Sequence, residues 1–117
     1  MDQENKIFYV EFHASDLGRT KAFFEKTFGW TFTDYGPDYA SFDNSGIAGG
    51  FFSSDKRGTI AAGAPLVVIQ NQRLEEALRR VTENGGRITQ EIFSFPGGRR
   101  FHFAEPSGNE LAVCAVG

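Results

Sequence analysis

Residues 7–30 have the sequence IFYVEFHASDLGRTKAFFEKTFGW, which predicts a strand followed by a helix. Apolar and polar side chains alternate over residues 7–14, and a period of two is typical of a strand with one buried face. Asp16 is placed to cap a helix, residues 17–28 carry an apolar stripe, and Gly29 can end the helix in a left-handed conformation. The stretch therefore predicts a βα unit.

The rest of the chain extends this unit with three short strands and then repeats the whole order. Residues 66–70 predict the first strand of the second repeat, and Asn71 is the expected N-cap of its helix. Apolar residues at helical spacing run from Leu74 to Val81, and Asn84 begins a glycine-containing stop. Glycine- and proline-containing turns separate the other strands, which we expect over residues 30–35, 39–43, 47–53, 87–95, 100–104 and 110–116.

These patterns predict an α+β fold of two tandem βαβββ modules, residues 6–53 and 64–116, within a single domain spanning residues 1–117. Each half-sheet must bury the side that faces its helix. Pairing the halves therefore creates a curved mixed sheet with helices on the convex side and a concave ligand cavity. Residues 54–63 contain charged and small residues, which predicts a mobile linker that is either a lid over the cavity or a solvated tether.

The composition limits the classes of function. The 117 residues include 13 Phe and 14 Gly, which favours many short strands around an aromatic interior. A net charge of −3 without a basic cluster argues against nucleic-acid binding. No apolar run is long enough to span a bilayer, and the polar, acidic start does not resemble a secretory signal. A single cysteine, Cys114, excludes an intrachain disulfide, so we expect a cytoplasmic protein.

Three motifs carry a family resemblance. Residues 12–30, FHASDLGRTKAFFEKTFGW, resemble the opening of vicinal oxygen chelate domains, the superfamily of glyoxalases, bleomycin-resistance proteins and extradiol dioxygenases. Residues 84–86, NGG, resemble the corresponding point of the second half, and residues 105–111, EPSGNEL, are similar to the family's Asp-Pro-x-Gly-Asn ending. The resemblance covers residues 7–116 and is nearest to proteins related to lactoylglutathione lyase.

The resemblance implies a divalent metal cofactor in the concave face, held by His and Glu from the first and last strands of both halves and acting as a Lewis acid. The first ligand position falls on Tyr9, whose neutral phenol, with a pKa of about 10, is a poor ligand. The last position falls on Ala112, and the two others fall within residues 49–52 and 64–68, which offer no metal-binding side chain. We therefore expect a metal-free protein without a cofactor.

An alternative centre built from Glu11, His13 and Glu110 departs from the family geometry. Glu11 and His13 share the strand face of Tyr9, and Glu110 shares that of Ala112. The simpler interpretation is that both carboxylates pair with arginines or accept hydrogen bonds at a wet cavity. The predicted ligand-binding residues are Tyr9, Glu11, His13, Phe51 and Glu110.

Aromatic and thiol side chains have two interpretations each. About half of the strand Phe residues should line the concave side, where they either stack on a planar ligand or simply fill the space. Phe8 and Phe12 should face the first helix. Cys114 would be a nucleophile only beside a histidine, and an inert small hydrophobe is the simpler interpretation. His102 is expected to be a partly buried histidine with a satisfied partner.

Three functions remain open. The first is a metal-free protein that binds a small molecule in its cavity, as the bleomycin-resistance proteins imply, in a homodimer. The second is a lyase or isomerase related to lactoylglutathione lyase, with Glu11 or Glu110 as general base and Tyr9 or His13 stabilising an oxyanion. The third is a structural or interaction domain whose cavity is filled.

Overall fold

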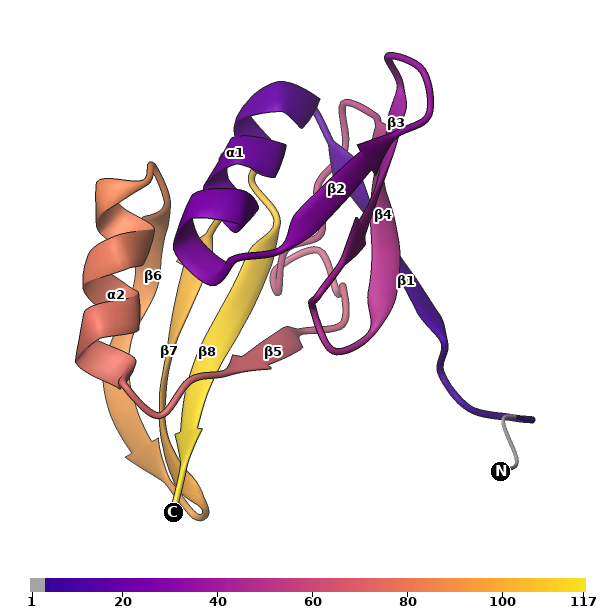
Figure 1. Cartoon of the computed structure of the whole chain (residues 1–117). Coiled ribbons are helices and arrows are strands. Elements are labelled where there is room, and N and C mark those ends of the chain that lie inside the picture. The colour runs from indigo at the N-terminus through magenta and orange to yellow at the C-terminus, as the bar shows by residue number, and fades with distance from the viewer. Residues whose placement is uncertain (1–3) are drawn as a thin grey trace.

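The computed structural model describes residues 4–117 and arranges them as two βαβββ modules (Figure 1). The first module contains β1 Tyr9–Ala14, α1 Leu17–Phe28, β2 Thr31–Asp34, β3 Tyr39–Asp43 and β4 Ala48–Ser53. The second contains β5 Val67–Gln70, α2 Leu74–Glu83, β6 Arg87–Phe95, β7 Gly98–Ala104 and β8 Glu110–Val116. The predicted α+β class and the tandem modules are confirmed.

Each module forms its own four-stranded mixed sheet, with the strand orders β1-β4-β3-β2 and β5-β8-β7-β6. In both sheets the first strand pairs in parallel with the last, and the other pairs are antiparallel. α1 covers one side of the first sheet and α2 one side of the second (Figure 1). Each sheet therefore has a helix face and, on its other side, an open face. Side chains that are opposite one another in the strand register share a face.

The two helices begin differently. The side chain of Asp16 accepts a hydrogen bond from the backbone N–H of Arg19 at 3.1 Å, as expected of an N-cap, and Gly29 ends α1 with φ 74°. Asn71, in contrast, is not the N-cap of α2. Its side-chain oxygen accepts from the N–H of Arg73 at 2.9 Å, so it forms a turn just before the helix instead.

The core lies under α1, which packs against both sheets. The ring of Phe24 stacks on Trp30 at 4.5 Å and contacts Phe51 of the first sheet. On the other side of α1, Phe23 lies 5.7 Å from Phe103 of the second sheet. The expectation that Phe8 faces α1 is wrong: β1 begins one residue later, and Phe8 is 80% exposed.

A buried polar network joins the modules at the turn between β7 and β8. Asn109 donates to the backbone oxygen of His13 at 2.6 Å and to the carboxylate of Glu105. Glu105, only 3% exposed, also accepts from Thr20 and from the N–H of Ser107. Burial nevertheless raises the pKa of Glu105 above its ordinary value. Residues 105–111, which carried the resemblance, therefore fix the two modules together.

The segment predicted as a mobile linker is hydrogen-bonded to β8. Gly58 donates from its N–H to Asn109 at 2.8 Å and accepts from the N–H of Glu110 at 2.9 Å. The N–H of Ile60 donates to the Glu110 carboxylate at 2.6 Å. Part of the segment thus follows the start of β8 instead of running free through solvent. Neither helix in residues 4–117 is long and apolar enough to cross a membrane.

Candidate functional site

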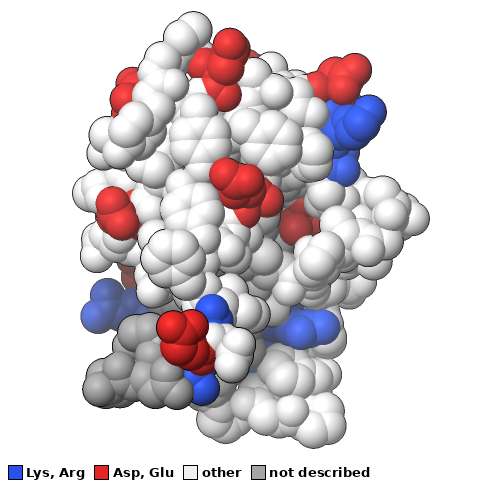
Figure 2. Space-filling model, turned by 90° about the vertical axis from the view of Figure 1, so that its right-hand side faces the viewer, with Lys and Arg blue, Asp and Glu red and all other residues white. Residues whose placement is uncertain are grey.

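The predicted site residues of β1 share the open face of the first sheet. Tyr9, Glu11 and His13 are paired in register with Ala48, Gly50 and Phe52 of β4. Phe12, the intervening residue, packs on Phe51 in the core, which identifies the opposite side as the helix face. Figure 2 views the molecule from the side opposite α1 and shows mostly uncharged side chains, several of them rings, with scattered acidic groups among them.

A chain of hydrogen bonds crosses this open face. The hydroxyl groups of Tyr9 and Tyr39 lie 2.5 Å apart, and Tyr39 donates to the Glu11 carboxylate at 2.9 Å. Because the Tyr39 hydroxyl donates its hydrogen bond to Glu11, it accepts one from Tyr9, which is the donor in the first pair. Burial and these hydrogen bonds raise the pKa of Tyr39 above its ordinary value, so the phenol stays neutral. Tyr9, Tyr39 and Glu11 form what we call the tyrosine chain.

Gly50 makes the tyrosine chain possible. Tyr39 belongs to β3 and Glu11 to β1, and β4 runs between them with Gly50 opposite Glu11. A Cβ atom at position 50 would lie 2.1 Å from the Tyr39 hydroxyl oxygen. The phenol of Tyr39 therefore occupies the space above β4 where any other residue would project its side chain.

His13 and Phe51 have different surroundings from those of the tyrosine chain. His13 is hydrogen-bonded through Nδ1 to the Ser54 hydroxyl at 2.9 Å, and its ring lies 4.6 Å from that of Phe52. Phe51 is 0% exposed in the core, so the expectation that it lines the ligand face is wrong. The reason is the register: Phe51 is opposite Phe12, which faces α1, and Phe52 holds the open-face position instead.

The open face of the second sheet carries the remaining predicted ligand-binding residue, the histidine that the sequence analysis expected to be satisfied, and an arginine that sequence reasoning passed over. Glu110 lies at the start of β8 opposite Ala104, on the same face as His102 and Arg100 of the neighbouring β7. The guanidinium carbon of Arg100 lies 5.5 Å from the ring centroid of Phe93 and 5.2 Å from that of Phe95. Arg100 and His102 alternate with the buried Phe101 and Phe103, and this alternation in the sequence indicates that they lie on the face opposite the core.

Two nitrogen atoms on this face are buried without a hydrogen-bond partner: Nε of Arg100 and Nε2 of His102. The expectation that His102 is satisfied is therefore wrong for that nitrogen. Burial first, and then the charge of Arg100, lower the pKa of His102, while the charge of Glu110 has a smaller, opposite effect. The histidine ring is thus held in its neutral form beside a permanent cation.

The donors at the family's metal positions do not fit a divalent cation. Tyr9 donates a hydrogen bond to Tyr39, and the Tyr39 phenol fills the space above Gly50. Ala112 on β8 has no donor atom. The alternative metal centre does not assemble either: within residues 4–117 no three His, Cys, Asp or Glu side chains converge as a metal site would require. Glu11, His13 and Glu110 instead have separate hydrogen-bond partners.

Cys114 is buried on the open face of the second sheet, opposite Arg100 and Gln70 in the register. In the part of the chain that the structure describes, no hydrogen bond joins its thiol to a histidine. A nucleophile needs such a base. The arrangement is that of a small buried side chain.

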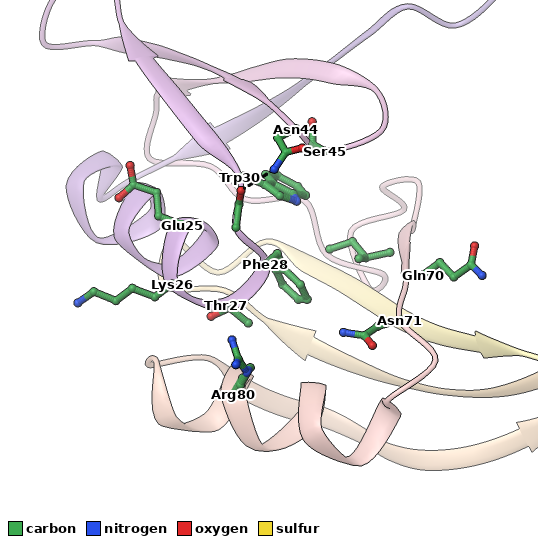
Figure 3. A pocket seen from close by; sticks show the side chains of 12 residues that line it. Glu25, Lys26, Thr27, Phe28, Trp30, Asn44, Ser45, Gln70, Asn71 and Arg80 are labelled. Atoms are coloured by element: carbon green, nitrogen blue, oxygen red, sulfur yellow. Dashed lines mark hydrogen bonds between the residues drawn. The ribbon is translucent and has the colours of Figure 1, made fainter.

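A groove of about 520 Å³ opens between the modules on the helix side of the molecule (Figure 3). Phe28 and Trp30 form its inner part, Lys26 and Arg80 lie at its rim, and Asn71 closes the end near β5 (Figure 3). None of the predicted ligand-binding residues lines this groove. It was not foreseen because its walls come from both modules.

Several solved structures share the fold. A glyoxalase-related enzyme from Fulvimarina pelagi is 15% identical and has a TM-score of 0.78, with 94% of this chain and 87% of that one covered. A glyoxalase/bleomycin resistance protein/dioxygenase family enzyme from Burkholderia phytofirmans is 13% identical, with a TM-score of 0.79 and 93% and 97% covered. The comparison with curated proteins finds no match.

A third similar structure is a mutant of the fosfomycin resistance protein FosX from Listeria monocytogenes, complexed with Mn(II) and 1S,2S-dihydroxypropylphosphonic acid. It is 17% identical to this chain and has a TM-score of 0.79, with 99% of this chain and 93% of that chain covered. At this identity the likeness shows the fold alone.

The family comparison reaches further. The family model described as Glyoxalase/Bleomycin resistance protein/Dioxygenase superfamily matches residues 6–113, which include both modules and all but the last residues of β8. This chain therefore belongs to the glyoxalase/bleomycin resistance protein/dioxygenase superfamily.

Proposed function

We propose that this member of the superfamily binds a small molecule on the open faces of its sheets without a divalent metal. The observation that carries the proposal is the tyrosine chain. At the family's first metal position Tyr9 is a hydrogen-bond donor to another phenol, and Tyr39 fills the space over Gly50. A cation at this place would have to displace Tyr39 and break the hydrogen bond that Tyr9 donates to it.

The open faces have the chemical character of a binding surface. Phenols, a carboxylate and aromatic rings lie together on the first sheet, and a cation in contact with two neighbouring rings lies on the second. Ligand sites combine apolar and aromatic walls with a few placed polar groups in this way. The two buried nitrogen atoms without partners argue against a structural domain with a filled cavity, because such atoms are costly unless something binds them.

A homodimer is part of the proposal. Phe8 is 80% exposed, and two further apolar side chains on the open face of the second sheet, Val68 and Val116, are 45% and 52% exposed. Exposed apolar side chains of this size can form a contact surface for another molecule when they lie on the same side of a folded chain. A second copy would cover this surface and help to enclose a ligand. We propose a cytoplasmic location on the basis of the single cysteine.

A second candidate function is a lyase or isomerase that uses Glu11 as general base. Glu11 is exposed and receives one hydrogen bond from Tyr39, which leaves a second carboxylate oxygen for a substrate proton. Glu110 is less suited, because one of its oxygens is bound by the N–H of Ile60. Turnover of a glutathione hemithioacetal that is lost in Glu11→Gln would favour this candidate over binding alone.

The test combines metal analysis with thermal denaturation. Elemental analysis of the native protein should find far less than one metal per chain, and Mn²⁺, Ni²⁺ and Zn²⁺ should not raise the melting temperature. Metabolites that bind should raise it equally with and without a chelator, since a ligand that prefers the folded state stabilises it. A stoichiometric metal lost in Glu11→Gln but retained in Glu83→Gln, a matched change on the exposed side of α2, would overturn the proposal.

A further inference from the structure

The open face of the second sheet holds a permanent cation without a protein anion. No ion pair joins Arg100 to a carboxylate among residues 4–117, although its neighbour Arg99 forms one with Glu75 at 2.7 Å. The two arginines are adjacent on β7 and point to opposite faces: Arg99 toward α2 and Arg100 away from it. Of these two arginines, Arg99 is paired and Arg100 has no ion pair with any of residues 4–117.

Polar atoms of Arg100 and of a neighbouring histidine lack partners. The Nε atom of Arg100 is buried and has no hydrogen-bond partner among residues 4–117, and the same is true of Nε2 of His102, two residues along the same strand. Both side chains contact the ring of Phe93, the guanidinium carbon at 5.5 Å and the histidine ring at 5.7 Å, centroid to centroid. The two side chains therefore lie against one aromatic ring on the same face.

The strand β6 is shaped to bring these aromatic rings over β7. Its pairing with β7 is irregular between Ile88 and Gln90 and again between Gln90 and Phe93. Such bulges re-aim side chains and are frequent next to binding sites. Beyond them, Phe93 is opposite Arg100 and Phe95 opposite Gly98, so the two rings lie side by side on the open face, and both contact the guanidinium.

We propose that Arg100 and His102 bind the anionic group of a small aromatic ligand, a carboxylate or a phosphate ester, whose ring lies against Phe93 and Phe95. The inference rests on the proposed ligand-binding function of the open faces and names the class of ligand. An oxyanion accepts from a guanidinium through charge-assisted hydrogen bonds and from a neutral imidazole N–H. The flanking rings supply apolar and stacking contacts for a planar group.

The probes are benzoate, phenyl phosphate, inorganic phosphate and the neutral isostere benzamide, followed by calorimetry and by amide chemical shifts of the full chain. Benzoate or phenyl phosphate should bind and shift the amides of β7, and the stronger of the two identifies the preferred anion. Benzamide should bind at least tenfold more weakly, because it lacks the charge that Arg100 requires. Inorganic phosphate should also be weaker than phenyl phosphate, since it lacks the ring.

The variants form matched pairs. Arg100→Gln should weaken binding of the aromatic anion by about tenfold to a hundredfold, which is the range for a hydrogen bond to a charged group. Arg99→Gln, the adjacent change on the helix face, should leave binding unchanged. Phe93→Leu should weaken the binding of phenyl phosphate and leave the binding of inorganic phosphate unchanged. The fold of each variant is checked by its amide spectrum.

Three outcomes would overturn the inference: equal losses in Arg100→Gln and Arg99→Gln, binding of benzamide as tight as that of benzoate, or anion-induced shifts away from β7. The failure of the inference is distinguishable from failure of the proposed function. A neutral metabolite that binds the open face equally in wild type and Arg100→Gln would leave the function standing and remove the anion site. Absence of binding by the aromatic anions and by every metabolite tried would remove both.

Discussion

The open faces of the two sheets have the same strand arrangement but differ in whether their polar side chains have hydrogen-bond partners. On the first sheet the polar groups of the predicted site have partners: Tyr9 with Tyr39, Tyr39 with Glu11, and His13 with Ser54. On the second sheet, Arg100 and His102 keep buried nitrogen atoms without partners. A folded chain gains stability by satisfying such groups and loses it by leaving them unpaired. The difference teaches that the hydrogen bonds of the first face contribute to its stability, and it supports the proposal that the second face binds a ligand.

The largest expected effect comes from breaking the first face at Gly50. A Cβ atom there would collide with the Tyr39 hydroxyl, so Gly50→Ala should expel Tyr39 and lower the free energy of unfolding by about 1–3 kcal/mol, the usual range for overpacking. The comparison variant is Gly18→Ala, where a Cβ would meet nothing within 4 Å in an exposed helical position. That change should stabilise the protein by up to about 1 kcal/mol. Urea denaturation measures both.

The contrast between these glycines decides whether the tyrosine chain is tightly packed. If Gly50→Ala is as harmless as Gly18→Ala, Tyr39 has room to move and does not block the space above β4. The argument against a metal at that place would then lose its geometric support.

Removing one hydroxyl from the tyrosine chain should have a smaller effect. Tyr39→Phe deletes the acceptor for Tyr9 and the donor for Glu11 and should lower the free energy of unfolding by about 0.5–1.5 kcal/mol. Tyr35→Phe is the control, because Tyr35 is 64% exposed and its hydroxyl takes part in no hydrogen bond with residues 4–117. Equal losses in the two variants would show that the tyrosine chain contributes nothing to the folded state.

The same hydroxyl predicts an alkaline pH dependence. The pKa of Tyr39 is raised by burial and by its hydrogen bonds, so the unfolded chain releases this proton at a lower pH than the folded one. The contribution of Tyr39 to stability is therefore complete below the ordinary tyrosine pKa of about 10 and is lost as the pH rises above it. Wild type should lose more stability than Tyr39→Phe over that range, as chemical denaturation at each pH will show.

The smallest effects are expected on the second face. His102→Leu and Arg100→Met remove buried nitrogen atoms that have no partner, so the free energy of unfolding should stay unchanged or rise by up to about 1 kcal/mol. The contact of Arg100 with two rings offsets part of the gain in that variant. A loss above about 1.5 kcal/mol in either variant would mean that these side chains are satisfied in the folded chain, and the difference between the two faces would disappear.

The sequence predicted the parts of the site that depend on one strand at a time. Alternation along β1 placed Tyr9, Glu11 and His13 on one face, and the structure brings them there. The same alternation indicates that His102 lies on the face opposite Phe101 and Phe103, and it could also have placed Arg100 there. Alternation failed at Phe51 and Phe52, because two adjacent aromatic residues fit either phase of the pattern. Only the pairing of β4 with β1 settles which of them is buried.

Local sequence also mispredicted places where a side chain has more than one backbone partner available. Asn71 has the right chemistry for an N-cap, but its side-chain oxygen accepts a hydrogen bond from the N–H of Arg73, two residues later. As a result, α2 begins without a side-chain cap. The charged and small residues after β4 predicted a mobile linker, either a lid or a solvated tether, and most of residues 54–63 are exposed. Their backbone is held by Asn109 and Glu110, which lie about fifty positions further along the chain.

The sequence by itself determined the two βαβββ modules, their order and the faces of most strands, because periodicity and turn chemistry act over a few residues. The tertiary structure alone decided which polar groups are satisfied. Tyr39 meets Glu11 because β4 runs between their strands with a glycine at the crossing point, and Arg100 stays unpaired because no carboxylate from residues 4–117 forms an ion pair with it on its face. Such partnerships depend on the register of strands that are distant in the sequence, and periodicity carries no information about that register.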